Sequence, residues 1–120
     1  MKQEPPQDIR ERSFEFAARV VNLCKKLDAS PGVPRTLSNQ LLRSGTSIGA
    51  NIEEAHGSQS KKDFRAKMYI SCKEARETHY WLRLLIKCDI ISEPQLTDIL
   101  DESNQLVAIV TTIVKKSGEA

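Results

Sequence analysis

Apolar residues recur at intervals of three and four positions along most of the chain, which is the spacing of an amphipathic helix and not the alternation of a strand. Clusters of proline, glycine and polar residues interrupt this pattern at residues 29–34, 56–59 and 89–94. The stretches between them predict four helices, over about residues 10–28, 36–56, 61–88 and 93–116. Ser60 is well placed to cap the third helix, and Ser92 with Gln95 has the spacing of a capping box for the fourth.

The connections between these helices are short, so neighbouring helices should run antiparallel. We therefore expect an all-α domain, an up-down-up-down four-helix bundle over residues 9–117, preceded by a flexible N-terminal segment over residues 1–8. A chain of 120 residues can bury such a core without metals or disulfides. Cys24, Cys72 and Cys88 show no Cys-x-x-Cys spacing, and we expect them to pack as small buried apolar residues.

The composition is that of an ordinary soluble globular protein, with 28% charged and 39% hydrophobic residues. The longest apolar runs span only a few residues, far short of the roughly 20 that cross a membrane. The start of the chain is polar and contains two adjacent prolines, so it lacks the apolar stretch of a signal peptide. We therefore expect a cytoplasmic protein that has no membrane partner.

The middle of the second helix is built from small residues, including Gly45 and Gly49. Glycine inside a helix costs about 1 kcal/mol relative to alanine, so these positions need a compensating role. Close approach of another helix, within the chain or from another subunit, would supply it.

The third helix separates its charges in a helical projection. One arc of about 80° contains six cations and two tyrosines but no acidic residue. These eight residues are Lys62, Arg65, Tyr69, Lys73, Arg76, Tyr80, Arg83 and Lys87. Basic side chains with interleaved aromatic rings suit phosphate contacts together with base stacking, which makes RNA or DNA a candidate partner. The alternative is a solvated helix face that happens to be basic.

The fourth helix has more apolar surface than a single core stripe requires. Beside its core row it carries a second row, Leu100, Val107 and Val114, and Ile109 extends the apolar arc on the other side. The arc exceeds the roughly 100° that a surface helix needs. Either the bundle wraps this helix tightly or the extra face meets another subunit, and we favour the subunit contact.

A row of polar residues lies beside the core of the second helix. Ser47, Asn51 and Glu54 align at helical spacing and could form a buried polar network with Arg76 or Glu77 opposite. Buried polar groups of this kind must be paired, and they tend to specify an arrangement more than to stabilise it. The alternative is a row that is simply exposed to solvent.

Catalytic and metal-binding signals are weak in this sequence. A di-iron site in a four-helix bundle needs two Glu-x-x-His motifs, and only Glu53 with His56 forms one, because Arg76 precedes His79 at that spacing. His79 falls on the core arc and is expected to be a satisfied buried histidine. No glycine-rich phosphate loop occurs either. We therefore expect no catalytic residues, no metal, no cofactor and no enzymatic activity.

Three motifs resemble those of a known family. The segment from Arg43 to Ala55 is very similar to the second-helix motif of bacterial four-helix bundle proteins encoded in intervening sequences of 23S ribosomal RNA genes. The segments Ser60–Phe64 and Lys73–Leu82 resemble the next two motifs in order and spacing. The similarity is close over roughly Leu37 to Leu85 and extends to the flanking helices in pattern only.

This resemblance implies a four-helix bundle that assembles as a ring, typically a homopentamer. The family is related to the accessory variability protein of diversity-generating retroelements, a basic pentamer that binds nucleic acid and a reverse transcriptase. The motif positions occupied by Asn51, Glu54, Glu77 and Trp81 fit structural roles in polar pairing and packing. The net charge of +2 is modest for a dedicated nucleic-acid binder, although five copies would carry +10.

The sequence therefore supports two main hypotheses. The first is a homo-oligomeric, pentameric bundle that binds structured RNA or DNA through the basic face of the third helix. The second is a protein–protein adaptor that holds a partner, such as a reverse transcriptase, against the ring. A metal-dependent enzyme is a remote third.

Overall fold

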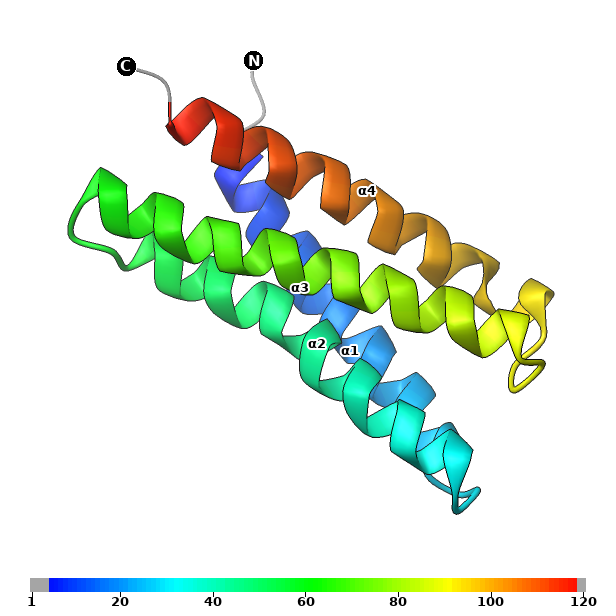
Figure 1. The fold of residues 1–120 in the computed structure, drawn as a ribbon. Coiled ribbons are helices and arrows are strands. Elements are labelled where there is room, and N and C mark those ends of the chain that lie inside the picture. Colours follow the sequence, from blue (N-terminus) through cyan, green and yellow to red (C-terminus); the bar gives the residue numbers. More distant parts are fainter. Residues whose placement is uncertain (1–4, 119–120) are drawn as a thin grey trace.

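The computed structural model describes residues 5–118, with side chains described from Ile9 onward. It contains four helices and, within that described range, no strand: α1 (Pro5–Leu27), α2 (Val33–His56), α3 (Lys61–Lys87) and α4 (Glu93–Ser117). Consecutive helices run antiparallel, so the predicted all-α architecture of four packed helices is confirmed (Figure 1). None of these helices combines the length and hydropathy that a membrane span requires.

The helices form an elongated body of 47 × 26 × 19 Å. α2 packs between α1 and α3, α3 packs against α4, and α1 and α4 meet over the smallest seam. The two hairpins, α1–α2 and α3–α4, diverge at the end that carries their connecting turns (Figure 1). A bidentate pair between Arg12 and Glu102 ties α1 to α4, with nitrogen–oxygen distances of 3.1 and 2.8 Å.

The helix boundaries agree with the predicted ones most closely in the second half of the chain. The Ser60 hydroxyl accepts a 3.0 Å hydrogen bond from the Asp63 backbone N–H, and Gln95 accepts one from the Ser92 backbone N–H at 3.4 Å. α1 instead begins at Pro5 and not at about residue 10, so residues 5–8 of the segment expected to be flexible are helical, and residues 1–4 lie outside the described range. α2 begins three residues earlier than predicted, after Gly32 at a φ of 93°.

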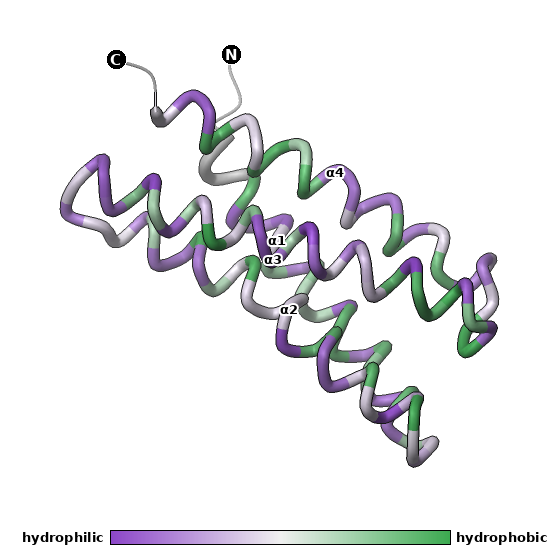
Figure 2. Tube along the Cα trace, in the orientation of Figure 1, coloured by the Kyte–Doolittle hydropathy of each residue, from purple (hydrophilic) through white to green (hydrophobic). Residues whose placement is uncertain are grey.

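The core is formed by apolar residues that recur along all four helices (Figure 2). Residues such as Phe16, Leu41, Met68 and Leu106 are almost completely buried. Cys24 and Cys72 are buried as predicted, but Cys88 is exposed because it lies at the C-cap of α3, beyond the last packed turn. The second apolar row of α4 is half-buried against the core cluster of the chain itself.

The glycines of α2 allow α1 to approach closely, as the sequence predicted. A β-carbon on Gly45 would lie 2.8 Å from a methyl carbon of Val20, and one on Gly49 would lie 3.2 Å from the Ser13 hydroxyl. The closest approach to both positions therefore comes from α1 of the same chain.

Candidate nucleic-acid interface

The predicted basic face forms one exposed side of α3. All eight of its members are exposed: Lys62, Arg65, Tyr69, Lys73, Arg76, Tyr80, Arg83 and Lys87. The opposite side of the helix packs into the bundle through Met68, Ala75 and Leu82, none of which has accessible surface. The 27-residue helix therefore displays its cations along roughly 40 Å of its length, given the rise of about 1.5 Å per residue.

The six cations of this face take no part in the ion pairs of the described residues. Those pairs are Arg10–Glu53, Arg12–Glu102, Arg35–Asp28, Arg43–Glu74, Arg43–Glu77 and Lys67–Glu54. Three acids of α3 adjoin these cations in sequence. Glu74 and Glu77 are held by Arg43 of α2 on another side of the helix, and Asp63 takes part in none of these ion pairs. The positive charge of the basic face is therefore not cancelled by a direct carboxylate partner.

The two tyrosines of the basic face have different surroundings. Tyr69 is 55% exposed, and the Lys73 ammonium lies 5.8 Å from the centre of its ring. Tyr80 is 53% exposed and packs edge to face against Trp81, with ring centres 5.1 Å apart. Both rings present area to solvent, but only Tyr80 is buttressed by a second aromatic ring.

Trp81 is linked to the neighbouring helix α2 through Glu77 of its own helix. Its indole N–H donates a 2.9 Å hydrogen bond to Glu77, and Arg43 of α2 donates to the same carboxylate. The chain of contacts runs from Arg43 through Glu77 and Trp81 to Tyr80. It fits the structural role that the motif resemblance implied for Glu77 and Trp81.

The buried polar network expected for Ser47, Asn51, Glu54 and Glu77 is not formed as one unit. Ser47 and Asn51 are half-buried and donate to backbone carbonyls of their own helix, at 2.7 and 2.8 Å. Glu54 is exposed and accepts a hydrogen bond from Lys67, which raises the pKa of that ammonium group. Short polar side chains inside a helix commonly satisfy themselves on the carbonyl one turn back, and this removes them from a network between helices.

The buried polar contacts between α2 and α3 involve other residues. Thr78 Oγ1 lies 2.9 Å from Ser44 Oγ, and the Ser71 hydroxyl donates to the Ile48 carbonyl at 2.9 Å. These three hydroxyl residues have no accessible surface. Ser44 lies between Leu41 and Ile48 at helical spacing, and a polar residue in such an apolar stripe was the available signal for this contact.

His79 is a partly buried histidine with a partner, as predicted. Its Nδ1 lies 2.8 Å from the hydroxyl of Ser103, which donates its own proton to the Leu100 carbonyl at 2.7 Å. The Ser103 hydroxyl therefore supplies a hydrogen-bond partner for this ring nitrogen. Burial lowers the pKa of His79, and the nearby charge of Arg83 lowers it further.

The Glu-x-x-His residues of α2 have other partners. Glu53 pairs with Arg10 at 2.8 Å, while His56 Nδ1 bonds the Ile52 carbonyl at 2.9 Å and its ring packs edge to face on Phe64. Across the part of the chain that the structure describes, no three metal-ligating side chains gather in one place.

α4 adds cations that the sequence did not single out. Lys115 and Lys116 are exposed in its last turn, which lies at the end of the bundle where α3 begins. The Arg65 guanidinium lies against Gly118 at that end. The antiparallel order of α3 and α4 brings these positions together, and no pattern within one helix could indicate it.

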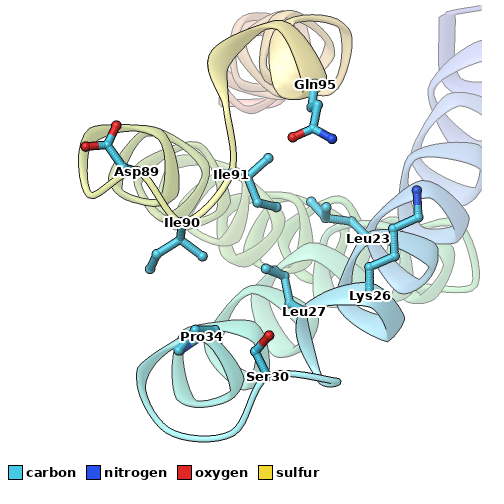
Figure 3. Close-up of a pocket in the computed structure, with 9 residues that line it drawn as sticks. All are labelled: Leu23, Lys26, Leu27, Ser30, Pro34, Asp89, Ile90, Ile91 and Gln95. Atoms are coloured by element: carbon cyan, nitrogen blue, oxygen red, sulfur yellow. The ribbon is translucent and has the colours of Figure 1, made fainter.

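Another hollow lies where the two hairpins diverge. It has a volume of about 500 Å³, and Leu23, Leu27 and Ile91 face one another across it (Figure 3). Lys26 is the cation among its lining residues, and no member of the basic face contributes. The hollow is therefore separate from the candidate interface.

The chain matches the model of the 23S rRNA-intervening sequence protein family over residues 6–112. The protein belongs to that family. The match covers most of all four helices, so the membership indicated by the three motifs is confirmed. No curated protein matches the chain.

A solved structure is similar to this intervening-sequence protein along nearly its whole length. It is a protein of unknown function from the S23 ribosomal protein family of Bacteroides thetaiotaomicron, with 43% sequence identity and a TM-score of 0.86. The similarity covers 93% of this chain and 99% of the other. It supports the four-helix fold of the family and assigns no activity.

Proposed function

We propose that this intervening-sequence protein is a non-enzymatic, cytoplasmic homo-oligomer that binds RNA or DNA through the basic face of α3. The observation that supports this function is the set of six cations on one exposed side of α3, none of which has an ion-pair partner among the described residues. Cations arranged in this way neutralise phosphates and release counterions. Binding is then largely independent of sequence and sensitive to salt.

Assembly would strengthen the interaction. One chain carries a net charge of only +2, whereas five copies carry +10 and present the basic face five times. Repetition of a charged surface raises both the local field and the effective concentration of binding sites. A pentamer is the state that the family resemblance implies, and light scattering of the eluted protein should give the mass of five chains.

The direct test is charge reversal on the basic face, read by retention of a labelled RNA stem-loop on filters. The variant carrying Arg65→Glu and Arg76→Glu should lose retention at low salt. The matched control carries Arg19→Glu and Lys25→Glu on α1, a helix whose backbone does not closely approach that of α3, and changes the net charge equally. Full retention by the control is expected, and equal loss in both variants would contradict the proposal.

A second candidate is a protein–protein adaptor, for example for a reverse transcriptase. Exposed apolar residues favour this candidate: Phe14 is 72% exposed, and Val21, which lies on the same side of α1, is 37% exposed. Binding of a partner through this surface should persist when the charges of Arg65 and Arg76 are reversed. Loss of partner binding in Phe14→Ser, with nucleic-acid retention intact, would support the adaptor function.

A further inference from the structure

A groove between α3 and α4 adjoins one end of the basic face. It has a volume of about 460 Å³, within the range of small-ligand sites. Three members of the basic face line it: Tyr80, Arg83 and Lys87. Its other lining includes Leu84 of α3 and Leu100 and Glu93 of α4. The groove therefore joins cations and an aromatic ring to an apolar surface.

The chemistry of this lining matches one nucleotide better than a stretch of duplex. A planar base can lie on the Tyr80 ring and the leucine side chains, while Arg83 and Lys87 contact phosphates on either side. A base inside a duplex is stacked and paired, so it cannot enter the groove. A duplex would contact the cations and leave the ring and the apolar lining unused.

Tyr80 is more strongly positioned for stacking than Tyr69. Trp81 packs against its ring in a T-shaped geometry, and the hydrogen bond from Trp81 to Glu77 fixes the indole in turn. The Lys73 ammonium, 5.8 Å from the ring centre, already lies over Tyr69. A ring held in place loses less freedom when a base stacks on it, so the two tyrosines should contribute unequally.

Glu93 gives the groove a preference among bases. Glu93 is one of the lining residues, yet its carboxylate forms no ion pair with the two cations there or with any other described residue. A carboxylate accepts hydrogen bonds and repels phosphate, so the group it can bind is the exocyclic amine of a base. Cytosine offers that amine and uracil does not.

We infer that the groove holds one unpaired, amine-bearing base of a single-stranded segment, stacked on Tyr80 and hydrogen-bonded to Glu93. This inference rests on the proposed function, because the rest of the basic face must bind the adjoining phosphates. It adds that single strands and loops, and not uniform duplex, are recognised at this site.

The test compares a 12-nucleotide oligocytidine RNA with a 12-base-pair duplex by fluorescence anisotropy. Tyr80→Leu should weaken binding of the single strand roughly tenfold and leave duplex binding within about twofold. Tyr69→Leu is the matched control, with the same change on the same face at nearly equal exposure, and it should have a smaller effect on both ligands. Thermal melting by circular dichroism checks that both variants fold.

The unmodified protein offers a second readout, because Trp81 is its single tryptophan. Oligocytidine should quench Trp81 emission, whereas the duplex should not. Oligouridine should bind at least about threefold more weakly than oligocytidine, and Glu93→Gln should remove that difference, since an amide can both donate and accept.

The outcomes separate the two claims. If the unmodified protein binds neither ligand, the proposed function fails and the inference fails with it. If both ligands bind but Tyr80→Leu lowers their affinities equally, or no more than Tyr69→Leu does, only the groove assignment is overturned. Equal affinity for the cytidine and uridine strands would overturn the role of Glu93.

Discussion

The indole nitrogen of Trp81 lies 2.9 Å from the carboxylate of Glu77, one turn earlier on α3. The same carboxylate receives a hydrogen bond from Arg43, so a single acidic group joins α2 to the aromatic pair at the edge of the basic face. A structural tie and a binding surface therefore share one residue. Mutations at Glu77 should affect both.

Glu77→Gln should destabilise the protein by about 1–2 kcal/mol, because the amide loses the charge that Arg43 and the indole N–H share. Urea denaturation followed by Trp81 emission measures this loss, and the native emission should shift to the red. Glu74→Gln is the control, since Glu74 also contacts Arg43, at 3.3 Å, but has no bond to Trp81. A Glu77 variant as stable as the Glu74 variant would contradict the assigned role.

Gly45→Ala should destabilise the protein by about 1–3 kcal/mol. The new methyl would lie 2.8 Å from a side-chain carbon of Val20, a residue with little rotamer freedom, and the better helix propensity of alanine offsets only part of that strain. Gly49→Ala, one turn away, meets the Ser13 hydroxyl at 3.2 Å and should cost less. Chemical denaturation of both variants gives the comparison, and the reverse order of stability would refute this packing account.

Stability should fall as the pH drops below the ordinary histidine pKa of 6.5, in part because of His79. Burial lowers the folded-state pKa, so between the two values the unfolded chain binds more protons than the folded one, and acid favours unfolding. The contribution is complete above pH 6.5 and is lost as the pH falls toward the folded-state pKa. Urea midpoints at pH 7.5 and 5.5 should differ less in His79→Gln than in the unmodified protein. An equal difference in the two proteins would show that His79 does not contribute to the pH dependence of stability.

The helices could be predicted from the sequence where local chemistry determines them. Ser60 caps α3 and Ser92 with Gln95 begins α4, and both signals lie within four residues of chain. The start of α1 at Pro5 was missed, because proline in a first turn reads equally well as part of an irregular segment. The close approach of another helix at Gly45 was predicted, because glycine inside a helix is unfavourable and needs a compensating role. That Val20 is the residue in contact there could be learned only from the packing.

The basic face was predictable in full because it belongs to one helix, and helical spacing alone places its cations together. Features that need two helices were not. The pairing of Ser44 with Thr78 depends on the register of α2 against α3, and Glu93 reaches the groove beside Tyr80 because α4 folds back along α3. The expected network of Ser47 and Asn51 is also a feature of two helices. It does not form, because these side chains bond to carbonyls of their own helix instead of to the neighbouring helix.

The central claim, that the basic face of α3 binds phosphates, is tested most directly by the salt dependence of binding to a single-stranded RNA. The logarithm of the association constant should fall linearly with the logarithm of salt concentration, by about 0.7 for each phosphate contact. Lys73→Gln and Arg83→Gln should each remove one phosphate contact and so reduce the magnitude of that slope by about 0.7, whereas Arg19→Gln on α1 should leave the slope unchanged. A slope near zero, or one that the α3 substitutions do not alter, would contradict the account.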